Sequence, residues 1–462
     1  MNLQLPSVHP PDQLPPPDLP QREFWRQVFP ELVLLWASGL LIGMRIVASL
    51  SLSEALGAIS LAACVALSTG WAKGQLALKL RSGQLHIPAW QQFTANLLLG
   101  LAKLTAAAAL LLELARYGLQ QLPQADSGWL LPVALLALLA LTVVLAPATA
   151  LQHWKPRSWL WLLPVGLLLL GVGWIELTRL GGLRSVERIG LSQISPTSWP
   201  DLLQATALLA VAYPSYEPLS LPVPTIAAST VRLVLKALGL GLGLGWLLFW
   251  GTALLANSSL VPTLITAASD AGIVRWIGLA AMATLTGALL TLLPQLTRQL
   301  LYLNQEVNQQ ARNSQVGVPQ AASYPDKRPS PVWGLIGLSM ILAALLLLGD
   351  LESFWSFSAF AGLMQAALVQ WTLLTAGLPA SRPFRRGQTA RSQTARSQTA
   401  RSWGARLPLR WLSLRECFQG LRLAVCLLAF WVDWQVWLVS LSLVTLGLVW
   451  RGMMQWSDHP GD

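Results

Sequence analysis

AYPSYEP, at residues 212–218, interrupts an otherwise apolar segment. Pro214 and Pro218 each remove a backbone donor and break the hydrogen-bond ladder of a helix. Between them stands Glu217, whose carboxylate is costly at membrane depth unless it is paired or faces a cavity. A membrane protein tolerates such a stretch only where other protein shields the backbone or where the backbone lines a pathway. The stretch therefore predicts a transport site inside a membrane.

The composition places the whole chain in a membrane. Of its 462 residues, 54% are hydrophobic and only 11% are charged, whereas soluble domains carry about 25% charged residues. The 23 tryptophans fit belts at the membrane interfaces. The three cysteines and four histidines show no metal-ligand spacing, which argues against a metal site and a disulfide framework. The net charge of +11 lies mainly in loops, so no nucleic-acid partner is expected.

Segments of about 20 apolar residues can cross a bilayer as helices, and twelve are predicted. They lie near 31–50, 54–74, 92–115, 128–147, 158–177, 202–225, 232–255, 273–296, 332–350, 354–378, 416–432 and 434–452. The predicted organisation is a disordered cytosolic tail at 1–30, a ten-span core at 31–378, a basic cytosolic loop at 379–415, and two further spans with a short tail at 416–462. The last two spans have an alternative interpretation as one long helix, which would reverse the C-terminus.

The distribution of basic residues predicts the orientation. With a cytosolic N-terminus and twelve spans, only five of the 31 basic residues fall outside, namely Arg116, Arg179, Arg184, Arg188 and Arg275. Arg45 falls within a span, and the others fall inside, with Lys73 and Lys103 counted among them. This bias predicts a multi-pass protein of the plasma (inner) membrane with both termini in the cytosol.

The loop at 379–415 contains three copies of the unit QTARS between residues 388 and 402. One interpretation is a patch for anionic lipids, since basic residues are attracted to the inner leaflet. The favoured interpretation is a disordered loop lengthened by repeat slippage, because the unit has no apolar face with which to stack.

Five segments, taken in order, resemble amino acid permeases of the amino acid–polyamine–organocation superfamily. LLAVAYPSYE at 208–217 is similar to the sixth span of that family, where an aromatic-rich run ends in an acid. The other four are GQLALKLRSG at 74–83, the segment 285–306, LLLLGDLESFWSFSAFAG at 345–362, and the closing pair of spans at 426–452. The resemblance covers most of the chain from about residue 55 onward.

The resemblance implies an all-α membrane fold of two inverted five-helix repeats, about 31–177 and 202–378, plus two peripheral helices. Spans 1 and 6 would be broken at mid-membrane, with the substrate held between them by exposed helix ends. It also implies a substrate-binding set, composed of Gly43, Met44 and Arg45 in span 1 and Tyr213, Ser215, Tyr216 and Glu217 in span 6. The substrate would be an amino acid or a related small solute, and no cofactor is implied.

Span 1 departs from the pattern of the family. Its Ile-Gly-Ser-Gly-Ile-Phe motif is replaced by IGMRIV at 42–47, so that Arg45 stands where a second glycine is usual. Arg45 would either bind an anionic or carboxylate-bearing substrate, pair with Glu217 and lock the centre, or reach an interface if span 1 is shifted. Glu217 itself would be either a structural carboxylate or a proton-coupling one.

The main hypothesis is a secondary transporter that works by alternating access. The alternative is a membrane subunit or scaffold that kept the permease fold without transporting, and Arg45 supports it. A membrane-embedded enzyme ranks last, because the chain has no cluster of acids or histidines. Glu113 and Glu176 are interpreted as interfacial residues at span ends, and Lys103, Arg298 and Arg422 as snorkelling residues.

Overall fold

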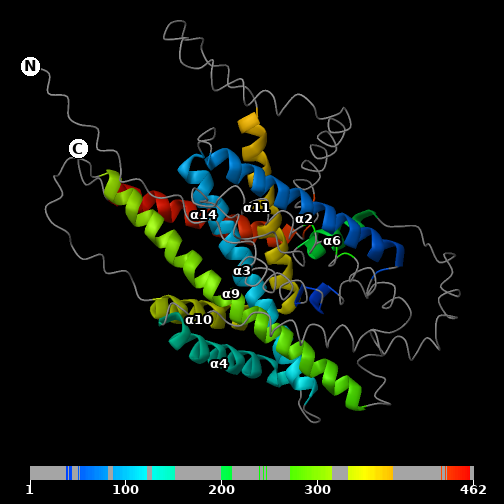
Figure 1. Cartoon of the computed structure of the whole chain (residues 1–462). Helices are drawn as coiled ribbons and strands as arrows, with labels where there is room; N and C mark the ends of the chain where they lie inside the picture. Colours follow the sequence, from blue (N-terminus) through cyan, green and yellow to red (C-terminus); the bar gives the residue numbers. More distant parts are fainter. Residues whose placement is uncertain are drawn as a thin grey trace, which may run out of the picture.

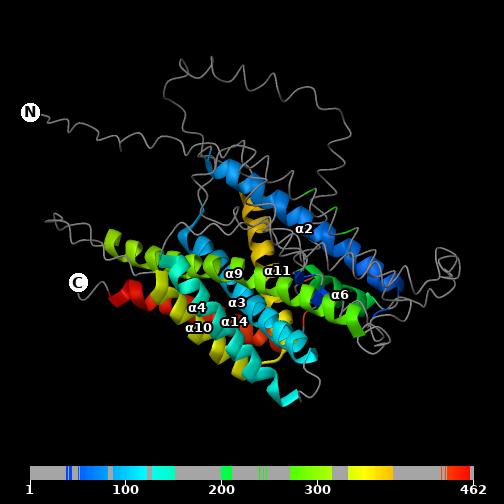
Figure 2. The ribbon, with the colours of Figure 1, turned by 60° about the horizontal axis from the view of Figure 1, so that its bottom comes forward.

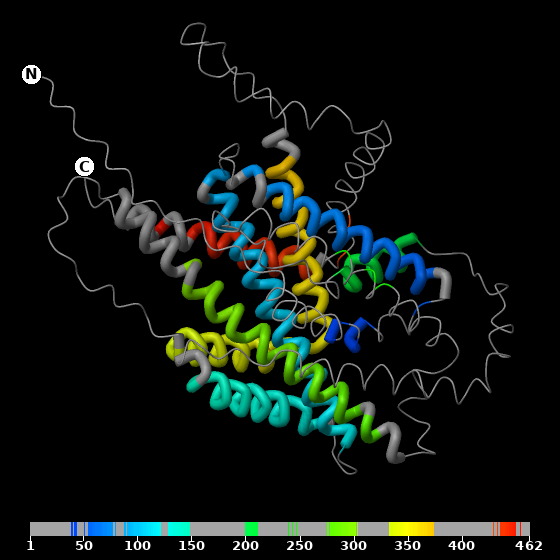
Figure 3. Tube along the Cα trace, viewed as in Figure 1, coloured from blue at the N-terminus to red at the C-terminus, as the bar shows by residue number. Residues whose placement is uncertain are grey.

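The computed structural model describes residues 38–39, 41–43, 50, 52–81, 87–121, 127–150, 199–210, 239, 243, 246, 271–314, 331–377, 428, 432 and 434–457. Within them the regular structure is entirely helical. The elements are α2 (Leu52–Arg81), α3 (Ala89–Gln120), η1 (Ser127–Trp129), α4 (Leu130–Ala150), α6 (Trp199–Ala210), α9 (Ala271–Ser314), α10 (Pro331–Leu348), α11 (Leu351–Gly377) and α14 (Trp434–Ser457). Figure 1 shows their arrangement, with the described helices as coloured ribbons, and Figure 3 traces the same view as a tube.

Several described helices are long and apolar enough to cross a membrane. They contain the segments Glu54–Leu76, Trp90–Gln120, Leu130–Pro147 and Gly278–Leu301. The shorter apolar segments Val332–Leu348 and Gln435–Val449 lie in α10 and α14. The prediction of an all-helical membrane protein is therefore confirmed. Spans 5, 7 and 11, most of span 1 and the second half of span 6 lie largely outside the described residues.

The predicted boundaries fail most clearly in α9. This helix continues to Ser314, 18 residues beyond the predicted end of its span at 296. Gln, Glu and Arg are good helix formers, and a helix that leaves the membrane can continue without apolar residues. Hydropathy marks the part of a helix inside the bilayer and not its end.

Helix α3 lies at the centre of the bundle. It packs against α4, α9, α10, α11 and α14, and its alanine-rich stretch belongs to the largest apolar core, where Ala107, Ala108 and Ala109 are fully buried. Small side chains let helices approach closely, and close van der Waals packing drives helix association in lipid. The sequence of α3 therefore suits a helix surrounded by other helices.

Contacts at two glycines fix the direction of α9 relative to α3. Gly118 of α3 faces Met282 of α9, and Gly100 of α3 faces Gln299. Higher numbers on one helix therefore meet lower numbers on the other, so the two helices are antiparallel. Inverted repeats place the third and eighth spans in this relation.

Helix α11 is also antiparallel to α3. The Ser358 hydroxyl of α11 donates to the Ala102 carbonyl of α3 over 2.9 Å, and further along α11, Val369 shares a cluster with Ala95.

Helices α2 and α6 are parallel to α11. Gly57 of α2 faces Leu202 at the start of α6, and Val65 shares a cluster with Ala207. Ser68 of α2 lies within 3.5 Å of Gln370 of α11. Both residues come later on their helices than Val65 and Phe360, which share an apolar cluster. Helices α2, α6, α9 and α11 thus run in one direction, as even-numbered spans should.

Helices α3, α4, α9 and α10 each pack against the other three. α3 and α4 belong to the first predicted repeat, and α9 and α10 to the second, so the two predicted repeats are in contact here. Figures 1 and 2 both show α4 and α10 side by side, and Thr142 is hydrogen-bonded to Ser339 between them at 2.7 Å.

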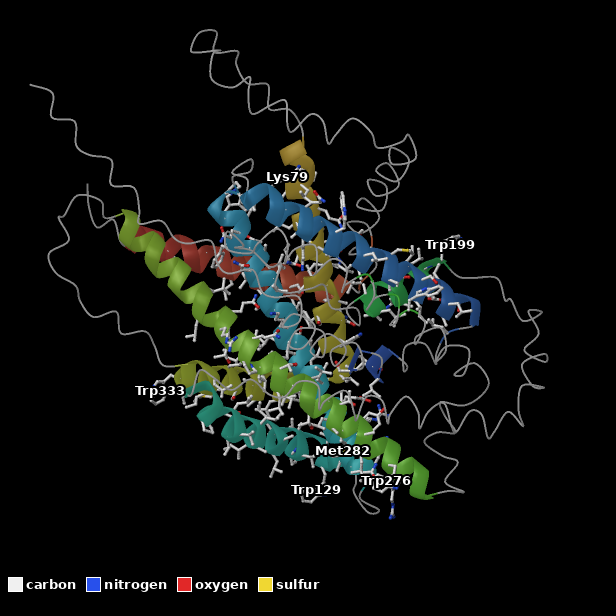
Figure 4. All side chains as sticks on the ribbon, viewed as in Figure 1. Lys79, Trp129, Trp199, Trp276, Met282 and Trp333 are labelled. Atoms are coloured by element: carbon white, nitrogen blue, oxygen red, sulfur yellow. The ribbon has the colours of Figure 1, made fainter. Side chains whose placement is uncertain are left out.

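Exposed tryptophans mark the two ends of the bundle. Trp199 begins α6, and Trp276 lies in the second turn of the parallel helix α9; they are 69% and 73% exposed. Trp90 begins the antiparallel α3, so it lies at the opposite end, and it is 54% exposed. Figure 4 shows Trp199 and Trp276 toward the right and lower edges, away from Trp333 and Lys79. Two levels of tryptophan are typical of membrane–water interfaces.

Candidate functional site

A cavity of about 800 Å³ lies where four helices begin. Its walls come from the first turn of α2, the early turns of α11 and α14, and one face of α6 from Asp201 to Leu208, together with Ile42 and Leu50 of the predicted first span. The α6 wall consists of Asp201, Gln204, Ala205 and Leu208. Cavities of roughly 300–1,000 Å³ hold small molecules in proteins, so the size suits a solute such as an amino acid.

The common direction of the helices explains why their starts meet. α14 is antiparallel to α3, because Val436 at its start lies in a cluster with Phe360 while Gly447, further along, faces Leu97 of α3. It therefore runs in the same direction as α2, α6 and α11. The last helix should have this direction if the final two spans are separate. Trp437 packs edge-on against Phe360, with ring centroids 4.7 Å apart, and this contact holds the start of α14 beside α11.

The mouth of the cavity is acidic. Glu54, Asp201, Asp350 and Glu352 line it, and none of the described lining residues carries a positive charge. Three of these carboxylates stand in the first turns of α2, α6 and α11, where they complement the positive end of the helix dipole. The same placement creates a negative potential, which concentrates cationic solutes and repels anions.

Asp350 has a structural task at the start of α11. Only Gly349 and Asp350 separate α10 from α11, and the Ser353 N–H donates to the Asp350 carboxylate over 2.8 Å, as in a helix N-cap. Hydrogen bonds from the Ser353 side chain and backbone hold the pKa of Asp350 below its usual value. An added Cβ at Gly349 would lie 2.7 Å from the ring of Phe354, so a larger residue there would have to displace that ring.

Replacing Asp350 by Ala should destabilise the protein by about 1 kcal/mol at neutral pH, the usual value of an N-cap. Because the folded-state pKa of Asp350 is lowered, its stabilisation is complete above the unfolded pKa and is lost as the pH falls through the folded one. Thermal unfolding of both proteins at pH 7 and near pH 3 measures this. The two curves should converge at the lower pH, and a constant difference would contradict the ionised cap.

Helix α11 contacts α6 just before the predicted break. The indole N–H of Trp355, a buried side chain of α11, donates to the Leu208 carbonyl of α6 over 3.0 Å. A donor from a neighbouring helix suits the backbone next to a break inside the membrane, where carbonyls need partners from the protein.

Of the predicted substrate-binding residues, only Gly43 is described. It is buried in a helical segment, next to Ile42, which lines the cavity. Met44, Arg45, Tyr213, Ser215, Tyr216 and Glu217 lie outside the described residues. The structure therefore brings the cavity to the neighbourhood of both predicted breaks, through Ile42 and Leu208, without testing the substrate-binding set.

Three charged residues are buried among the helices. Lys73 is 1% exposed, Lys103 7% and Glu113 3%. The prediction of a snorkelling Lys103 was wrong, because this residue lies midway along α3, which is surrounded by other helices. The cytosolic side of Lys73 and the interfacial level of Glu113 stay predictions, since burial against protein does not measure depth in a membrane.

Metal binding finds no support among the residues that the structure describes, because no three His, Cys, Asp or Glu side chains there could hold one ion together. The four acids that line the cavity are therefore spread apart. Together they can attract positively charged solutes to the opening of the cavity.

Comparison with known proteins places the fold. No family model and no curated protein sequence matches the chain. Among solved structures, a manganese transporter of Eremococcus coleocola, in complex with an aromatic bis-isothiourea substituted compound, aligns with a TM-score of 0.51 at 12% identity, covering 93% of this chain and 95% of that one. A Na⁺-coupled sialic acid symporter aligns with a TM-score of 0.40 at 14% identity, covering 73% and 78%. The first of these likenesses, over almost the full length of both chains, shows that the protein has the LeuT-like helical fold.

Proposed function

We propose that the protein is a secondary transporter that moves a small solute by alternating access between broken spans 1 and 6. One observation carries the proposal, namely that the cavity is lined both by Ile42 of span 1 and by α6 up to Leu208. In a LeuT-like fold these are the elements whose ends meet at the solute. The amino acid permease resemblance and the manganese transporter with the same fold both support transport as the activity.

The proposed solute is an amino acid or a related molecule that carries a positive charge. The four carboxylates at the mouth favour cationic and zwitterionic solutes and repel purely anionic ones. Arg45 is proposed to meet the carboxylate of such a solute deeper in the pathway. The acidic mouth would then attract the positively charged group of a zwitterion, and Arg45 would bind its carboxylate.

The proposed orientation has the cavity open to the outside of the plasma (inner) membrane. Lys79 lies near the other end of α2, far from the cavity (Figure 4), and basic residues favour the cytosolic side. Under this orientation both termini are cytosolic.

Uptake into proteoliposomes tests the proposal. Labelled lysine, arginine, alanine, leucine and glutamate would be offered with and without an inward proton gradient, against empty liposomes. We expect accumulation of basic or neutral amino acids to exceed that of glutamate. A background level of uptake for the whole panel would favour the non-transporting scaffold, for which Arg45 in place of a glycine is the specific support.

The proposed role of Glu217 in proton coupling has its own test. If Glu217 carries the proton, Glu217→Gln should abolish the dependence of uptake on the gradient and flatten its pH profile. Asp201→Asn, which removes a carboxylate from the exposed rim, is the control and should keep the gradient dependence. An unchanged pH profile in Glu217→Gln would exclude proton coupling by this carboxylate and favour a structural role.

A further inference from the structure

Helix α14 forms one wall of the cavity. Gln435, Val436 and Val439 line the cavity, and all three belong to the first two turns of the helix. Successive residues of a helix are about 100° apart, so these side chains share one face. Leu441 lies about 200° from Val439 and does not line the cavity, although it is 54% exposed. One face of α14 therefore meets the cavity, and the opposite face is available to lipid.

Packing along its length holds α14 in place. At its start, Val436 is 6% exposed and shares an apolar cluster with Ala207 of α6 and Phe360 of α11. Further along, an added Cβ at Gly447 would lie 2.7 Å from the Leu97 side chain of α3, so the two helices approach each other closely there. α14 is thus packed against its neighbours at both ends of its apolar segment, and its cavity face has a fixed place beside α6 and α11.

The described lining of the cavity combines acids with a few uncharged donors. Besides the four carboxylates, it contains two amides and two hydroxyls, those of Gln204, Gln435, Ser353 and Ser356. The Ser353 hydroxyl is already bonded to Asp350. An ionised carboxylate only accepts hydrogen bonds, whereas an amide carries two N–H donors. A solute carboxylate at the mouth therefore depends mainly on the amides, since the acids repel it.

We propose that α14 is a wall of the solute pathway, and that Gln435 selects solutes in which a carboxylate accompanies the positive charge. This inference rests on the proposed function, because it concerns the solute of the same cavity. The Gln435 amide donates to the solute carboxylate, while the acids of the mouth attract the amino groups. Gln435 also makes an interaction within the protein, and an amide has up to four hydrogen-bonding positions, so it can bind a ligand as well. The selected solutes are amino acids such as lysine, in preference to diamines of the same length.

Cysteine labelling tests the wall without any need for transport. Val439→Cys and Leu441→Cys are a matched pair, because the two side chains are 48% and 54% exposed and only Val439 lines the cavity. Both are made in a background that carries serine in place of Cys64, Cys417 and Cys426. We expect the cationic thiol reagent MTSET to modify Val439→Cys at least tenfold faster in proteoliposomes, because only the thiolate reacts and a thiol in apolar surroundings stays protonated. Equal rates at the two positions would overturn the wall.

Protection of Val439→Cys from MTSET measures the selection by Gln435. Lysine and cadaverine are the matched solutes, because cadaverine is lysine without its carboxylate. We expect lysine to halve the labelling rate at a severalfold lower concentration than cadaverine. Gln435→Glu should remove this preference, because a further acid at the mouth repels the carboxylate and attracts the diamine. Gln92→Glu, which adds the same charge in the first turn of α3 at the opposite end of the bundle, is the control and should keep the preference.

The outcomes separate this inference from the proposed transport. An unchanged preference for lysine in Gln435→Glu would overturn the selective role of Gln435. Labelling that neither solute slows would show that no such solute occupies the cavity, and it would overturn the inference as a whole. Protection by lysine without uptake into proteoliposomes would support the binding site and refute transport. Gln435→Glu should fold, because an acid in the first turn of a helix complements the helix dipole.

Discussion

Gln204→Trp is expected to lower the uptake rate by at least tenfold while the protein remains folded. Gln204 is exposed and lines the α6 wall of the cavity, so the indole would enter the open space without displacing buried side chains. A rise of about 1.4 kcal/mol in the barrier is enough for a tenfold loss. Initial rates in proteoliposomes, normalised to reconstituted protein, measure the effect.

Gln204→Ala is the matched control, because it widens the cavity at the same position. It should retain uptake, and both variants should unfold within about 0.5 kcal/mol of the wild type, as exposed substitutions usually do. Wild-type rates in Gln204→Trp would show that the solute does not pass through this cavity. The fold would stand, but the proposed pathway would be wrong.

Gly57→Phe should give the largest loss of stability, about 1–3 kcal/mol, the usual cost of overpacking. A Cβ at Gly57 would already lie 3.0 Å from the Cδ1 atom of Leu202 on α6, and Leu202 is only 6% exposed. The phenyl ring would therefore force α2 and α6 apart at the edge of the cavity. Unfolding followed by tryptophan fluorescence in detergent measures the change.

Gly337→Phe serves as the control for the same substitution. Gly337 lies on α10, and a Cβ there would meet no atom within 4 Å, so the ring would extend into lipid or detergent. Its stability should stay within about 0.5 kcal/mol of the wild type. Equal losses in the two variants would indicate a general effect of the bulky ring, and the tight α2–α6 contact would lose its support.

The fold was largely predictable because membrane helices can be recognised in a sequence by their length and apolar content. The predicted spans at 92–115 and 332–350 correspond to α3 and α10 within a few residues. The polar last turns of α9 were not predicted, since hydropathy alone does not distinguish a polar helix from a loop. The finer assignment to amino acid permeases stays a prediction, as the structural likeness is one of fold at 12% identity.

The site was less predictable because it arises from packing. Glu54, Asp201 and Glu352 are far apart in the sequence, and each alone is an ordinary acid in a first helical turn. Only the parallel course of their helices gathers them at one cavity. The depth of Lys103 was misjudged for a similar reason, since a long side chain can reach an interface only when lipid, and not another helix, lies beside it.

Solute counterflow in proteoliposomes tests the central claim most directly. Vesicles loaded with unlabelled amino acid are diluted into a trace of the labelled form, with no ion gradient imposed. A carrier that alternates access exchanges the two pools, so a transient overshoot of label inside the vesicles is predicted, and it should be lost in Gln204→Trp. Labelling no higher than in empty vesicles, for every amino acid in the panel, would contradict transport by this protein.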